Sequence, residues 1–245
     1  MNERTPFYLI TTIFLFITIV LSLATTFHLN QNGADFFPNK GTYKGVVIHD
    51  NTFMDKLCWY FSQITHHTLF LLFSYFSMAL FNYKSVKFFK IVGPLALTIS
   101  VLYFYFLYPR QKLKIHQLSF YNFFSHFMII FLVFCEFMYI DTYEFYETTN
   151  CFVFLITSIL CIYINYCLRG VWSYDLIKLD SLSGWRLVSE TTLIMYLFSL
   201  MFYVLKYKNT PYYGLDDINM MNVSYPLYGL INIAYVLLII QYDSV

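Results

Sequence analysis

Charged residues are scarce in this sequence. Only 12% of the 245 residues are Asp, Glu, Lys or Arg, whereas 59% are apolar or aromatic. A soluble domain carries roughly 25% charged residues, so water is not the solvent for which this surface is built. The formal net charge is +1 and no block of basic residues occurs, which excludes nucleic acid as the expected partner.

The sequence also lacks the spacings that hold common cofactors. Its five cysteines form no CxxC or Cys/His pattern, no HExxH occurs, and no glycine-rich phosphate loop or pair of catalytic carboxylates is found. We therefore predict no cofactor and no metal. A haem held between His67 and His126 is the alternative, because imidazoles from two helices can ligate iron.

The sequence contains long apolar runs. A span needs about 20 residues, since ~30 Å of hydrocarbon is crossed at 1.5 Å per residue. Seven stretches approach this length, which predicts an all-α, polytopic transmembrane helical bundle of six to seven spans in a single domain, residues 1–245. They are Thr5–His28, Leu57–Tyr83, Ile91–Pro109, Ile115–Cys135 (continuing to Ile140), Thr148–Leu168, Leu187–Leu205 and Ile218–Tyr242.

The connecting loops set the expected orientation. With seven spans, the odd-numbered loops and the C-terminus share a side that holds nine of the 15 Lys and Arg residues, which favours that side as cytoplasmic. The first apolar run is too long for a signal-peptide core, so we expect it to be retained. We expect an integral membrane protein of the endoplasmic reticulum or another endomembrane; the plasma membrane and a mitochondrial membrane are the alternatives.

Polar residues gather towards one membrane face, where hydrocarbon makes them costly. Spans two, four and six start on the side of the odd-numbered loops, and span five ends there. The residues concerned are Ser62, Thr65, His66 and Thr68 in span two, Asn122 and His126 in span four, Gly170, Trp172 and Tyr174 after span five, and Glu190 in span six.

A hydroxyl beside a histidine is the minimum apparatus for covalent acyl transfer, because the imidazole accepts the hydroxyl proton while the oxygen attacks an ester carbonyl. Ser62 and His126 are the pair that we predict. The alternative is that both side chains only form interhelical hydrogen bonds, as Ser and His often do in bundles.

Two stretches of the sequence resemble a known family. Asn122 precedes His126 by four residues and Glu136 follows it by ten, while Gly170, Trp172 and Tyr174 close the next span. These elements are similar to those of the androgen-induced and androgen-dependent TFPI-regulating family of multi-span membrane proteins, which hydrolyse fatty acid esters of hydroxy fatty acids. The resemblance covers residues 6–208, and the final span, residues 218–242, lies beyond it.

The resemblance implies roles for individual residues. It places the family's histidine on His126 and its threonine nucleophile near Ser62, with Thr65 or Thr68 as the alternative match. Asn122 would then orient or polarise the reacting groups. Four residues are expected to contact substrate, of which His66 is also an alternative base: Trp172, Tyr174, Thr65 and His66.

The predicted function is therefore an integral membrane hydrolase of lipid esters, with membrane lipids and a lipid ester substrate as its partners. Protein partners are not identified by the sequence. The competing hypothesis is a non-catalytic multi-span protein, such as a structural subunit of a membrane complex or a lipid-binding scaffold.

Overall fold

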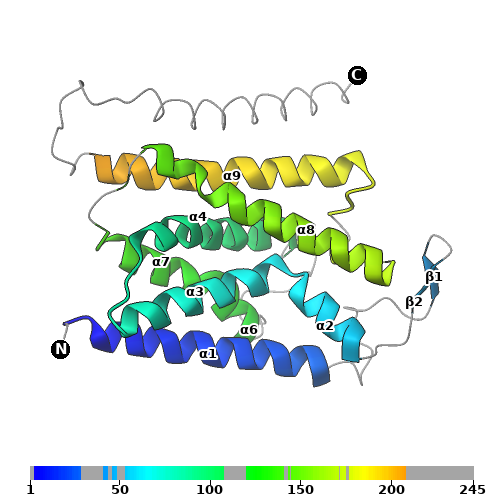
Figure 1. The fold of residues 1–245 in the computed structure, drawn as a ribbon, viewed down its shortest axis with the longest axis horizontal. Helices are drawn as coiled ribbons and strands as arrows, with labels where there is room; N and C mark the ends of the chain where they lie inside the picture. The colour runs from blue at the N-terminus through cyan, green and yellow to red at the C-terminus, as the bar shows by residue number, and fades with distance from the viewer. Residues whose placement is uncertain are drawn as a thin grey trace.

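The computed structural model shows an elongated bundle whose helices run along its length (Figure 1). It describes residues 3–28, 41–43, 46–48, 53–107, 120–140, 143, 145–170, 172–174 and 177–207. The predicted final span, residues 218–242, lies outside these ranges. The all-α prediction holds for the bundle, and the described part adds one short antiparallel hairpin, which pairs Gly41 with Ile48 and Tyr43 with Val46.

The elements follow one another along the chain as helices, with short π-helical and 3₁₀ segments between them. They are α1 (Thr5–His28), β1 (Gly41–Tyr43), β2 (Val46–Ile48), α2 (Phe53–Phe61), α3 (Ile64–Leu80), α4 (Val86–Leu102), the π-helix η2 (Tyr103–Leu107), α6 (Phe120–Phe123), the π-helix η4 (Phe124–Met128), α7 (Ile129–Phe137), the 3₁₀ helix η5 (Phe145–Thr149), α8 (Cys151–Arg169) and α9 (Leu182–Tyr207).

Four segments of the described chain are long and apolar enough to cross a bilayer. They are Thr5–Ala24, Val86–Tyr105, Glu147–Arg169 and Leu182–Lys206, and two shorter apolar helices, Ile64–Leu80 and Tyr121–Phe137, accompany them. Large apolar side chains stand exposed along α1 and α8, among them Ile10, Phe16, Val153 and Ile156. Such a surface is compatible with an integral membrane protein, because lipid solvates it and water does not.

Helix α4 forms the centre of the bundle and separates α3 from α9 (Figure 1). Every residue from Val92 to Ser100 is buried. The stretch includes Gly93, where an added Cβ would lie 3.0 Å from the ring of Phe202 on α9. In lipid, the hydrophobic effect does not drive helices together, and small residues allow the close van der Waals packing on which helix association depends. Hydroxyls on this helix bond its own carbonyls, as Thr98 does with Pro94 at 2.8 Å.

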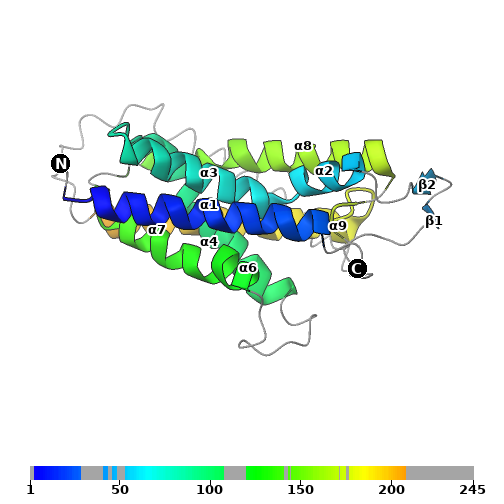
Figure 2. The ribbon, with the colours of Figure 1, turned by 90° about the horizontal axis from the view of Figure 1, so that it is seen from below.

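The predicted second span, Leu57–Tyr83, is not one continuous helix. The helix is interrupted at Ser62 and Gln63, so that α2 and α3 are separate helices that meet at an angle (Figure 1). Figure 2 shows α2 beside α8, while α3 continues along α1. Ser62 therefore lies in the turn before α3 begins, whereas His66 lies in the first turn of α3.

A buried carboxylate ties three helices together at the end of the bundle where α1 begins. Glu136 on α7 is fully buried. Its carboxylate accepts a hydrogen bond of 2.6 Å from the Tyr75 phenol on α3 and pairs with Lys84 at 2.8 Å and with Arg4 at 3.5 Å. Two cations and a phenol thus stabilise the negative charge of Glu136, which would be very costly to bury in hydrocarbon without partners.

We predict that Glu136→Gln lowers the free energy of unfolding by about 2–4 kcal/mol, because it leaves Lys84 and Arg4 without a counter-charge in a largely dry site. Thermal unfolding in detergent micelles measures the change. The matched control is Glu190→Gln, whose partner Arg186 lies on an exposed surface and whose loss should cost less than about 0.5 kcal/mol. An equal loss of unfolding free energy in the two variants would contradict the stabilisation that we ascribe to the buried network.

Candidate functional site

The break between α2 and α3 leaves backbone groups at two helix ends without partners in their own helices. Two adjacent histidines at the start of α3 bond the last carbonyls of α2: the His66 Nδ1 to the Tyr60 carbonyl at 2.8 Å, and the His67 Nε2 to the Phe61 carbonyl. Since a carbonyl only accepts, each of these nitrogens carries a proton. The two histidines therefore cap α2.

The segment that follows α8 bonds the start of α3. Gly170 adopts a left-handed conformation with φ of 70°, and its N–H donates to the Tyr166 carbonyl at 2.8 Å, which ends the helix. Beyond it, the Ser173 carbonyl accepts from the Gln63 amide at 3.1 Å, and the Tyr174 phenol accepts from the Ile64 N–H at 2.9 Å. Residues 172–174 thus cap α3.

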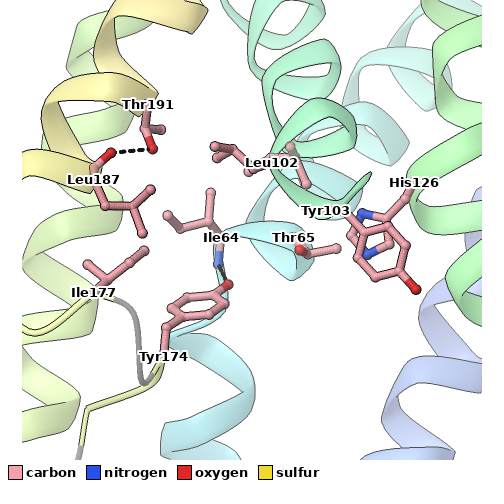
Figure 3. A pocket seen from close by; sticks show the side chains of 10 residues that line it. Ile64, Thr65, Leu102, Tyr103, His126, Tyr174, Ile177, Leu187 and Thr191 are labelled. Carbon is pink, nitrogen blue, oxygen red and sulfur yellow. Dashed lines mark hydrogen bonds between the residues drawn. The ribbon is translucent and has the colours of Figure 1, made fainter. Parts of the chain in front are cut away.

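A cavity of about 50 Å³ opens beside this junction, which is space for a few water molecules. Most of its wall is apolar, and three of its polar residues come from separate places in the fold (Figure 3). The start of α3 contributes Thr65, the π-helix η4 contributes His126, and the segment after α8 contributes Tyr174. The full lining is Ile64, Thr65, Ile99, Leu102, Tyr103, His126, Tyr174, Ile177, Leu187 and Thr191.

Thr65 differs from Thr68 and Ser74, which lie on the same helix, in what its side chain contacts. The Thr68 hydroxyl donates to the Ile64 carbonyl at 2.9 Å, and the Ser74 hydroxyl donates to the Phe70 carbonyl at 2.8 Å. Such bonds to the preceding turn satisfy a hydroxyl within its own helix. The Thr65 hydroxyl instead interacts with the Tyr174 phenol across the cavity. It is therefore placed to meet a ligand.

His126 is buried and stacks face to face on Tyr103, with ring centroids 3.8 Å apart and ring planes 2° from parallel. Within the described part of the chain its Nδ1 has no hydrogen-bond partner. Tyr103 begins the π-helix η2 and His126 lies in the π-helix η4. Two single-turn π segments therefore meet at this stacked pair, a helix irregularity that recurs at functional sites.

The Tyr174 phenol keeps its proton. Burial raises the pKa of this phenol above its ordinary value. Because its oxygen already accepts from the Ile64 N–H, its single proton is directed to another acceptor. The Thr65 oxygen is one such acceptor, and a carbonyl oxygen of a bound ligand is another.

The structure thus joins three of the seven predicted site residues, Thr65, His126 and Tyr174, around one cavity. It places the other four elsewhere. Ser62 is buried in the turn, and its hydroxyl donates to the Trp59 carbonyl at 2.7 Å. Asn122 lies one turn before His126 on α6, and neither it nor His66, which caps α2, is among the residues that line the cavity.

Trp172, the last of the seven, is a core residue. Its ring is buried and stacks on Tyr166, with centroids 3.9 Å apart. It packs in the same apolar cluster as Ile64 and Ile99, two residues of the cavity wall. Trp172 therefore belongs to the apolar core that includes part of the cavity wall.

Sequence reasoning missed Tyr103 and the aliphatic wall formed by Ile99, Leu102, Ile177 and Leu187. Tyr103 is one of 24 tyrosines in the chain and lies in an apolar run, so no sequence pattern distinguishes it. Thr191, which follows the predicted Glu190, also lines the cavity, and its hydroxyl donates to the Leu187 carbonyl at 2.8 Å.

No family model, no curated protein and no solved structure matches this chain. The chemistry of the cavity is therefore argued from its own geometry.

We predict that Tyr174→Phe lowers the free energy of unfolding by about 1–3 kcal/mol, because the Ile64 N–H loses its acceptor in a buried position. Tyr83→Phe is the matched control, since the Tyr83 side chain is 74% exposed and its phenol is free to bond with solvent. Thermal unfolding in detergent compares the two. A Tyr174→Phe protein as stable as the control would show that the phenol does not cap α3.

Proposed function

We propose that this protein is an integral membrane hydrolase of lipid esters in which Thr65 is the nucleophile and His126 is the general base. The observation that carries the proposal is the shared cavity, where a hydroxyl not committed to its own helix and a buried imidazole with a free nitrogen line one space. This assignment selects Thr65, the alternative match of the resemblance, over Ser62, whose hydroxyl is bonded to Trp59.

The proposed reaction has two halves. In the first, His126 takes the Thr65 hydroxyl proton while the oxygen attacks the ester carbonyl, and the alcohol then leaves with that proton as the C–O bond breaks. In the second, His126 takes a proton from water, the hydroxide attacks the acyl-threonine carbonyl, and the carboxylic acid is released as Thr65 regains its proton. Atoms and charge balance without a cofactor.

We assign the Tyr174 phenol as the hydrogen-bond donor to the carbonyl oxygen of the bound ester. Each half of the reaction places negative charge on that oxygen, and a preorganised donor is most effective there. The Tyr174 phenol is held in place by the Ile64 N–H and has its own proton to donate. The adjoining N-terminus of α3 adds a favourable dipole for a developing negative charge.

The size and lining of the cavity fit an ester that arrives from the bilayer. About 50 Å³ accepts the reacting ester group but not a long acyl chain, so the chains of the substrate would remain among lipids and the exposed apolar faces of neighbouring helices. This is the substrate class of the androgen-induced hydrolases, fatty acid esters of hydroxy fatty acids. A lipid-binding scaffold that uses the same cavity without turnover is the competing function.

We predict that Thr65→Val and His126→Gln each reduce kcat for hydrolysis of a long-chain p-nitrophenyl ester, or of a fatty acid ester of a hydroxy fatty acid, by roughly 10³-fold or more. Both groups act directly in bond making, so neither loss is compensated by tighter binding. Purified protein in mixed micelles provides the assay.

The matched control for this experiment is Thr68→Val, on the same helix three residues further on. It removes a hydroxyl bonded to its own helix, which costs about 1 kcal/mol of stability or less and leaves turnover near wild type. Wild-type turnover in both Thr65→Val and His126→Gln would overturn the assignment. Inactivity of Ser62→Ala, with Thr65→Val active, would move the nucleophile to Ser62.

We also propose six to seven membrane crossings, with α2 and α3 together forming the second. Lys87 and Ser183 are both exposed and lie in the first turns of α4 and α9, two helices that begin at opposite ends of the bundle (Figure 1). In a cysteine-free protein, we predict that Lys87→Cys and Ser183→Cys react with a membrane-impermeant maleimide from opposite sides of sealed vesicles. Labelling of both from the same side would contradict this topology.

A further inference from the structure

In the part of the chain that the structure describes, no carboxylate orients the base of the proposed reaction. In hydrolases with a hydroxyl nucleophile and a histidine, a third group usually holds the imidazole and stabilises the imidazolium that forms. Within the described residues no carboxylate pairs with His126, and its Nδ1 accepts or donates no hydrogen bond. Glu136, ten residues further along the chain, is engaged by Lys84 and Tyr75.

The ring of Tyr103 instead packs on the face of the His126 imidazole. It lies 3.8 Å from the His126 imidazole and 2° from parallel to it, and both side chains are buried. A face-to-face contact of this kind opposes rotation of the imidazole about its Cβ–Cγ bond, because that rotation would tilt the ring out of the stack. The negative face of a tyrosine ring also attracts a cation placed over it, and more strongly when water is excluded.

The backbone on both sides supports this contact. Tyr103 is the first residue of η2, directly after α4 ends at Leu102, and His126 is the third residue of η4. Each π-helical turn carries one extra residue, which shifts the side chains that follow it around the helix axis. Both rings thus sit where the helical register changes on facing elements.

We propose that Tyr103 is the positioning residue of His126: its ring face orients the neutral imidazole towards Thr65 and stabilises the imidazolium in the transition state. This inference rests on the proposed function. The phenol hydroxyl has no part in it, so the aromatic face is what the protein requires at position 103.

The experiment compares Tyr103→Phe, which keeps the ring, with Tyr103→Met, which keeps a large apolar side chain without a ring face. We expect Tyr103→Phe to retain kcat within roughly 2- to 3-fold of wild type. Tyr103→Met should lower kcat by roughly 3- to 30-fold, the range that a cation–π contact supplies, with KM unchanged within about 2-fold. Thermal unfolding of both variants in detergent confirms that each is folded.

The outcomes separate this inference from the proposed function. If His126→Gln is inactive while Tyr103→Met retains wild-type kcat, only the role of Tyr103 is overturned. A fall in kcat that is equal in Tyr103→Phe and Tyr103→Met also overturns it, because the ring face would then not be the active feature. If His126→Gln retains wild-type turnover, the proposed function fails and the role of Tyr103 fails with it.

Discussion

The hydrogen bonds exchanged at the break between α2 and α3 set the geometry of everything around the cavity. In hydrocarbon, an unpaired backbone N–H or carbonyl costs several kcal/mol, so a helix can break only where neighbouring groups bond the freed positions. Here His66 and His67 bond the carbonyl end of α2, while Tyr174 bonds the amide end of α3. These contacts fix where α3 begins, and they bring the segment after α8 against the first turn of α3. The cavity lies at that meeting point.

The positions of the helices follow from the apolar runs, because the length of hydrocarbon to be crossed imposes the length of each run. The first predicted span, Thr5–His28, coincides with α1, and α8 and α9 fall on predicted spans with shifted ends. The break at Ser62 was not predicted, because neither Ser62 nor Gln63 is a proline or a glycine and the run on both sides is continuous. The two histidines were interpreted as site residues since the sequence does not show which backbone groups stand opposite them.

At the site, sequence reasoning identified the polar members and not the wall. Thr65, His126 and Tyr174 are conspicuous because polar groups are rare in such apolar stretches, and helix direction places all three towards one face. Ser62 and Thr65 are only three residues apart, and their surroundings differ because the helix is interrupted between α2 and α3. Tyr103 and the aliphatic residues resemble their surroundings in type. Their roles come from contacts between helices that are distant in sequence, such as the stack of Tyr103 on His126.

The ion pair between Arg4 and Glu136 has a consequence for how the protein is made. The two residues lie 132 positions apart in the chain. At a synthesis rate of roughly 5–20 residues per second, Arg4 emerges between about 7 and 26 s before its partner. During that interval the start of α1 has no buried acid to bind, so its guanidinium group stays with water and lipid head groups. Arrival of α7 then recruits α1 and α3 together, since Glu136 bonds both Arg4 and Tyr75. The start of α1 can thus pair with Glu136 only after α7 has been made.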